Sequence, residues 1–200
     1  MASKVQICNI AIFDAGGDAI NSVPDSGKKE SDLIVAHYDV ALDFVLGEHP
    51  WRFAKKWASL AENAAYTFVD DTYAAAWALP ADFIRWSDLE DNGPSHIEFA
   101  RRDSHLLTVD IDSFEIEYIA RITDTTKYPA YFITALAAYL SLKLAPALRR
   151  KGSKDKTDFF HAYSLALDNA KLRDSREDWQ NETRVHKHTS TNDTWITARG

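Results

Sequence analysis

The stretches WALPADFIRW at residues 77–86 and FEIEYIARI at residues 114–122 delimit a strand-dense island in an otherwise helical sequence. In the second stretch, Phe114, Ile116 and Tyr118 alternate with more polar residues. Such an alternation is typical of a strand with one buried and one solvated face. The island therefore predicts a small antiparallel sheet.

Two further patterns inside the island support the sheet. Residues 96–101, HIEFAR, have the same period of two, and DNGPS at residues 91–95 is typical of a turn between strands. From Tyr66 onward, β-branched and aromatic residues are broken by turn signals. Residues 55–65 are compatible either with a short helix or with extended chain.

Helical patterns precede the island. Ser3 is a favourable N-cap residue and Gly16-Gly17 supplies a stop, so a first helix is expected between them. A second helix is expected from residue 26 or 31 to Leu46. Its predicted apolar face is Leu33, Ala36, Val40 and Phe44.

Two more helices are expected after the island. The Ala-rich segment 129–144 has the strongest helical pattern, and Pro146 is expected to end or kink it. A last helix is expected from about residue 153 to residue 180. Its predicted apolar face is Phe160, Tyr163, Leu167 and Ala170. Residues 181–200 are polar and are expected to form an extended C-terminal tail.

These elements predict an α+β, mainly α fold: a helical bundle with a small antiparallel β-sheet insertion. The bundle is assigned to residues 1–65 and 123–180, the β-rich insertion to residues 66–122 and the tail to residues 181–200. A chain of 200 residues with 46% apolar content is large enough for a real core.

Composition excludes several classes of protein. The net charge of −7 opposes binding to nucleic acid, which depends on cationic side chains neutralising phosphates. No signal peptide and no run of about 18 apolar residues is recognisable, so no membrane span is expected. The single cysteine, Cys8, cannot form an internal disulfide and is interpreted as a packing residue, as is His49.

No motif for catalysis or cofactor binding is recognisable. Glu98, Asp103 and His105 are the most plausible catalytic trio, but their spacing matches no known arrangement. We therefore expect no enzyme, no cofactor and no metal site. The acidic pairs and paired histidines lack the further ligands of a metal site; they are Asp70–Asp71, Asp110–Asp112 and His186–His188.

The order and spacing of five segments resemble a known family. They are AGG with INS at residues 15–22, HPWRFA at 49–54, WALPADFIR at 77–85, YIARI at 118–122 and YPAYFITALAA at 128–138. Together they make the chain similar to the head–tail connector or adaptor proteins of short-tailed phages, the tail tubular protein A family. The resemblance covers most of the chain.

The resemblance implies a structural virion protein that works in the phage tail connector and is assembled in the host cytoplasm. Members of the family form a homo-oligomeric ring, usually a dodecamer, beneath the portal. The ring links the portal protein to the tail nozzle protein and extends the channel through which DNA passes without specific binding. No catalytic residues carry over.

Two functional hypotheses follow. In the first, the chain is a ring-forming adaptor, and the C-terminal segment with Trp179, Arg184 and Trp195 docks onto the portal protein. In the alternative, it is a monomeric protein-binding module that uses the β-rich insertion. A large ring on mixing with portal protein would favour the first hypothesis, and a persistent monomer would favour the second.

Overall fold

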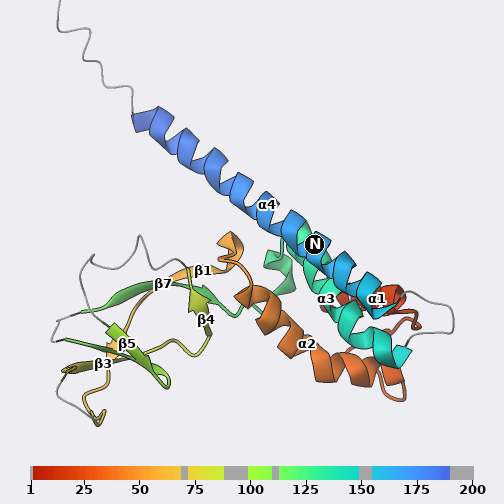
Figure 1. Cartoon of the computed structure of the whole chain (residues 1–200), viewed down its shortest axis with the longest axis horizontal. Helices are drawn as coiled ribbons and strands as arrows, with labels where there is room; N and C mark the ends of the chain where they lie inside the picture. Colours follow the sequence, from red (N-terminus) through yellow and green to blue (C-terminus); the bar gives the residue numbers. More distant parts are fainter. Residues whose placement is uncertain (1, 69–71, 88–98, 110–112, 149–154, 190–200) are drawn as a thin grey trace, which may run out of the picture.

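The computed structural model describes residues 2–68, 72–87, 99–109, 113–148 and 155–189, with the side chains of the last helix as far as Glu177. Within these residues, the helices gather on one side of the molecule and the strands on the other (Figure 1). The long C-terminal helix runs along the helical side and extends beyond it (Figure 1).

Helix α1 (Lys4–Ala15) begins and ends where the sequence predicted. The Ser3 hydroxyl accepts a hydrogen bond from the backbone N–H of Gln6, and the Gln6 side chain accepts one from the N–H of Ser3. This reciprocal pair is a capping box. At the other end, Gly16 has a φ of 89°, a left-handed conformation that favours glycine.

Helix α2 (Lys29–Gly47) turns a different face to the core than predicted. Val40 is 67% exposed and Phe44 is 43% exposed, so the predicted apolar face is wrong. The helix carries apolar residues on more than one side, and periodicity alone does not say which side is covered. The residues buried in the structure are Ser31, Ile34, Tyr38, Ala41, Leu42, Val45 and Leu46.

Helix α3 (Ala130–Leu148) lies at the centre of the helical part and packs against α1, α2 and α4. Ala135, Ala137 and Ala145 are buried, and such small side chains let neighbouring helices approach closely. Pro146 lies inside the last turn, so the helix continues past the predicted end at Leu144.

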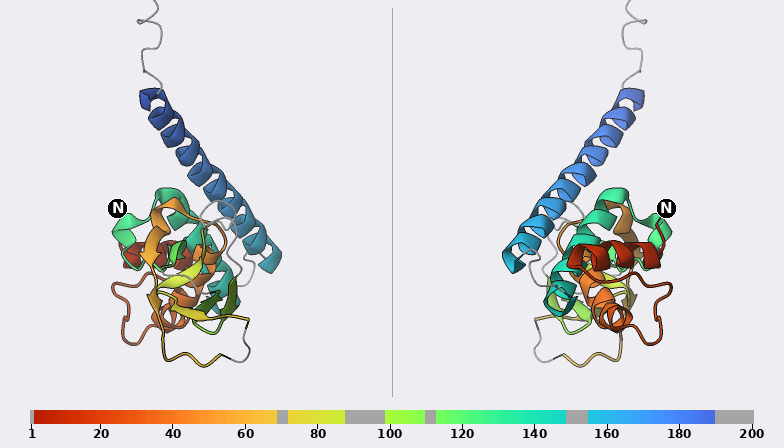
Figure 2. Two further views of the ribbon diagram at one scale, coloured as in Figure 1. Left: turned by 90° about the vertical axis from the view of Figure 1, so that its left-hand side faces the viewer. Right: turned by 90° about the vertical axis from the view of Figure 1, so that its right-hand side faces the viewer.

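Helix α4 (Lys156–Thr189) has 34 residues, which corresponds to a length of about 50 Å at ~1.5 Å per residue. Its N-terminal part packs on α3, whereas its C-terminal part extends away from all other elements (Figures 1 and 2). Phe159 is buried in place of the predicted Phe160, which is exposed. The helix includes residues 181–189, where the sequence predicted an extended tail; residues 190–200 lie outside the described residues.

The strands form two antiparallel sheets. In the first sheet, β7 (Glu115–Ala120) lies between β1 (Lys55–Ser59) and β4 (Phe83–Trp86). The second sheet has the order β2 (Ala61–Glu62), β3 (Ala75–Ala78), β6 (His105–Thr108) and β5 (Phe99–Arg102). Short 3-10 helices, η1 (Arg52–Ala54) and η2 (Thr125–Lys127), precede β1 and α3.

The predicted fold class is therefore corrected. The chain has an α+β fold with one three-stranded and one four-stranded sheet, and not a helical bundle with one small sheet. Within residues 55–65, for which helix and extended chain both remained open, Lys55–Ser59 form β1 and Ala61–Glu62 form β2. A period of two identifies a strand but carries no information on the sheet it joins, because partners such as Lys55 and Ile119 lie far apart in the sequence.

The first sheet is fastened to helix α2. The Arg121 guanidinium contacts Asp39 (2.9 Å) and Asp43, both on α2. The Arg85 side chain donates to the carbonyl of Gly47 at the end of the helix (3.1 Å). These contacts hold the β-rich part against one end of the helical part.

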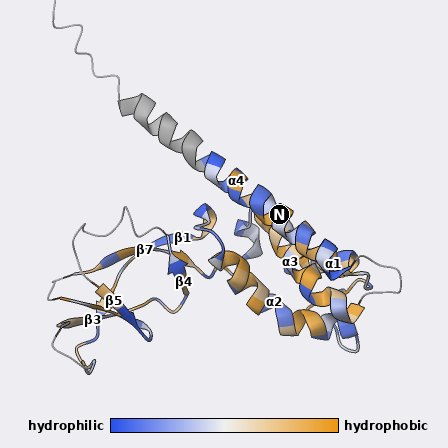
Figure 3. Cartoon of the chain, viewed as in Figure 1, coloured by the Kyte–Doolittle hydropathy of each residue, from blue (hydrophilic) through white to orange (hydrophobic). Residues whose placement is uncertain are grey.

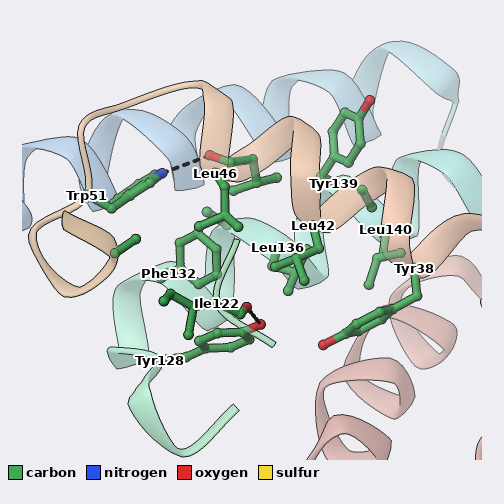
Figure 4. Close-up of a cluster of buried hydrophobic side chains, with 14 of the residues drawn as sticks. Tyr38, Leu42, Leu46, Trp51, Ile122, Tyr128, Phe132, Leu136, Tyr139 and Leu140 are labelled. Carbon is green, nitrogen blue, oxygen red and sulfur yellow. Dashed lines mark hydrogen bonds between the residues drawn. The ribbon is translucent and has the colours of Figure 1, made fainter. Parts of the chain in front are cut away.

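Aromatic and aliphatic side chains fill the core among the helices (Figure 4). Trp51 is fully buried, and its indole N–H donates to the carbonyl of Val45 (2.8 Å). The Phe132 ring meets Trp51 edge to face, and the Tyr128 hydroxyl donates to the carbonyl of Ile122 (2.6 Å). Figure 3 shows that hydrophobic residues concentrate on α2 and α3, whereas α4 is more hydrophilic.

Candidate interaction surfaces

A buried carboxylate lies where three parts of the chain meet. Asp174 of α4 is almost completely buried. It accepts hydrogen bonds from the Tyr131 hydroxyl of α3 (2.8 Å) and from the backbone N–H of Arg52 (3.3 Å). His49 Nε2 lies 3.1 Å from the same carboxylate. Because an ionised carboxylate only accepts, His49 Nε2 carries the proton of this contact.

The cluster keeps Asp174 charged. Burial raises the pKa of Asp174, but the hydrogen bonds from His49, Tyr131 and Arg52 outweigh it and hold that pKa below its usual range. The pKa of Tyr131 is raised by burial and by its bond to Asp174. The arrangement fastens α4 to the segment between α2 and β1, so the HPWRFA segment at residues 49–54 has a structural role.

Sequence reasoning did not single out Asp174. An acidic side chain is normally read as solvent-facing. The sequence did contain a signal for its burial. Asp174 continues, at helical spacing, the apolar row of Tyr163, Leu167 and Ala170, and these three apolar residues are buried. An acid in line with an apolar helix face indicates a buried partner.

Of the catalytic trio considered from the sequence, Asp103 and His105 lie in the described part of the chain. Asp103 lies in the turn between β5 and β6 with a φ of 50°. The His105 ring contacts Asn63 Nδ2 through Nε2 (3.0 Å) and the Ser104 hydroxyl through Nδ1 (3.4 Å). Glu98 lies outside the described residues. His105 is therefore engaged by neutral polar groups.

Cys8 packs in the core, as expected. It is fully buried, and burial raises the pKa of its thiol to about 11. Among the described residues, no group of three or more His, Cys, Asp or Glu side chains is placed to hold a metal ion. The remaining metal candidates lie beyond the described side chains: Asp70–Asp71, Asp110–Asp112 and His186–His188.

Two of the three predicted portal-docking residues, Trp179 and Arg184, belong to the projecting part of α4. The structure describes the helical backbone at these two positions but not their side chains. Trp195 lies outside the described residues altogether. The part of α4 that carries Trp179 and Arg184 extends beyond the rest of the fold (Figure 1).

Three helices expose large apolar side chains on their outer faces. On α1, Ile10 is 44% exposed and Phe13 is 59% exposed. On α4, Leu165 is 65% exposed and Leu172 is 50% exposed. Together with the exposed Val40 of α2, these residues give three outer faces that the described part of the chain leaves uncovered.

The face of α1 borders a groove. The groove has a volume of about 760 Å³ and lies between α1 and the segment that enters α3. Its lining is mostly apolar and includes Ile10, Phe13, Tyr128 and Ile133, with Gln6 and Asn9 as polar neighbours. Its shape and composition suit an apolar protein surface.

Helix α3 is the one helix in the described part of the chain that is long and apolar enough to cross a membrane by length and composition alone. Half of its most apolar window is buried, and the helix packs against three other helices. A central core helix passes the same test, and this position accounts for its composition.

No family model matches the chain, and no curated protein matches it.

Proposed function

We propose that this chain is a structural head-to-tail adaptor of a short-tailed phage. It assembles into a ring below the portal protein, links the portal to the tail nozzle protein, and forms part of the channel for DNA. The role is non-catalytic. The observation that carries the proposal is the exposure of large apolar side chains on the outer faces of α1, α2 and α4.

Helix α2 illustrates why these faces favour assembly. One side of the helix is buried in the core, while Val35 and Val40 are exposed and Phe44 is partly so. Apolar residues on both sides of a helix are typical of a helix that packs against other protein surfaces on both sides. Single exposed apolar residues are common on monomers, but repeated ones on three helices are typical of surfaces that meet a partner.

The projecting part of α4 supports a second contact. A helix gains most of its stability from packing, and this part has no tertiary partner within the described residues. Docking onto another protein would supply the missing contacts. We assign portal binding to this end of the chain, with Trp179, Arg184 and Trp195 as the docking candidates.

The mass of the assembled protein tests the proposal. Native mass spectrometry or light scattering is applied to the chain alone, to portal protein alone and to their mixture. The adaptor role predicts a complex that contains many copies of this chain on each portal, with a dodecamer as the expected ring. A chain that stays monomeric beside intact portal protein contradicts the role and favours a monomeric protein-binding module instead.

A further inference from the structure

The outer faces of α1 and α4 lie on opposite sides of the helical part. Both helices pack on α3. Seen from either end of the molecule, α1 and α4 flank α3 on its two sides (Figure 2). A subunit with two different contact faces on opposite sides assembles head to tail, which closes into a ring when the rotation between copies permits.

The face on α1 is concave. Gln6, Ile10 and Phe13 follow each other at helical spacing and are exposed on one side of the helix. They border the groove of about 760 Å³ next to the start of α3. Asp14 is exposed beside Phe13, so an acidic group lies next to the apolar groove.

The face on α4 is a convex ridge. Leu165 and Leu172 are seven residues apart and therefore lie on the same side of the helix. Both are exposed in the described structure. Asp168, between the two leucines, and Arg176, one turn after Leu172, are also exposed, so the ridge carries one acidic and one basic group.

We propose that the α4 ridge of one copy lies in the α1 groove of the next copy. Leu165 and Leu172 would cover Ile10 and Phe13, and Arg176 would approach the acidic group at Asp14 of the neighbour. The occupant of the groove is a second copy of this chain, because ridge and groove both expose apolar side chains and Arg176, at the C-terminal end of the ridge, is opposite in charge to Asp14. This inference rests on the proposed ring and names the surfaces that build it.

Cysteine cross-linking tests the pairing directly. Phe13→Cys and Leu172→Cys chains are prepared separately, mixed at high concentration and treated with a short bis-maleimide. A head-to-tail contact brings residue 13 of one copy to residue 172 of the other, so the mixture yields a covalent dimer. Each variant alone yields little, because the contact joins unlike faces. The wild-type chain, in which the buried Cys8 is the single cysteine, gives the background level of cross-linking.

A mixture of Val40→Cys and Leu172→Cys is the matched control, since Val40 is at least as exposed as Phe13 but lies on α2. It is expected to give no dimer above background. Equal dimer yields from the control, or from either variant alone, would overturn the pairing. A second measurement uses Leu172→Glu, which is expected to weaken self-association by about tenfold or more, as loss of a central apolar contact does.

The outcomes separate this inference from the proposed function. Large complexes with portal protein but no cross-linked dimer in the Phe13/Leu172 mixture would sink the pairing and leave the adaptor role standing. A cross-linked dimer from a chain that never forms large complexes with portal protein would support the pairing and contradict the adaptor role.

Discussion

Asp174 Oδ2 lies 3.1 Å from His49 Nε2, a contact that spans 125 residues of sequence and joins α4 to the segment after α2. The Asp174 carboxylate also accepts hydrogen bonds from the Tyr131 hydroxyl and from the backbone N–H of Arg52. It is thus the acceptor shared by three donors from two other parts of the chain. This relationship joins α4 to α3 and to the segment between α2 and β1.

Asp174→Ala is expected to destabilise the protein by about 3 kcal/mol, because it leaves three donors without their shared acceptor in a nearly buried site. Asp174→Asn keeps an acceptor oxygen and is expected to cost less. Urea unfolding followed by circular dichroism measures both. Asp168→Ala, on the exposed side of α4, is the control and is expected to change the free energy of unfolding by less than about 0.5 kcal/mol. An Asp174→Ala protein as stable as this control would contradict the assigned role.

The same carboxylate predicts a pH dependence. The hydrogen bonds to Asp174 lower its pKa in the folded state, so the unfolded chain binds a proton more readily. The stabilisation is therefore present above the ordinary aspartate pKa of about 4 and is lost as the pH falls through the lower, folded value. Unfolding free energies measured from neutral to acidic pH are expected to fall less steeply in Asp174→Asn than in the wild-type chain. An equally steep fall of the unfolding free energy at acidic pH in the two proteins would rule this out.

Gly16→Ala is expected to destabilise the protein by about 1 kcal/mol, because Gly16 ends α1 with a φ of 89° and a side chain strains that conformation. Gly47→Ala is the matched control. Gly47 ends α2 without a positive φ, and an added Cβ would lie 3.9 Å from its nearest neighbour, Ile84, an ordinary contact. This second change is expected to be neutral or slightly stabilising. Thermal unfolding compares the two, and equal melting temperatures would contradict the argument.

Deleting the residues after Asn181 is expected to leave a folded protein that binds portal protein less well. The deletion retains Asp174 and the buried face of α4, so the melting temperature should stay close to that of the full chain. It removes the end of α4 and the segment with Trp195. A pull-down with portal protein measures the binding. Removal of residues 190–200 alone separates the contribution of Trp195 from that of the helix, and undiminished capture by the chain ending at Asn181 would exclude the segment as the docking arm.

Local signals were read correctly where neighbouring residues decide the structure. Ser3 and Gly16 defined the ends of α1, because capping and a left-handed stop involve residues within one turn. The period of two in residues 114–122 identified β7. The same kind of signal misassigned the face of α2, since Val40 and Phe44 form an apolar row as regular as the buried one.

The sequence by itself determined the ends of α1, the helix α3, the strand β7 and the buried Cys8, because these follow from local conformational preferences and from side-chain chemistry. Only the tertiary structure decided that the strands divide into two sheets, that Asp174 meets His49, and that the faces of α1 and α4 stay uncovered on opposite sides of α3. The physical reason is the same in each case. Pairing, burial and exposure depend on which distant segments meet, and the free energy that selects those partners comes from the whole packed chain and not from any short stretch of it.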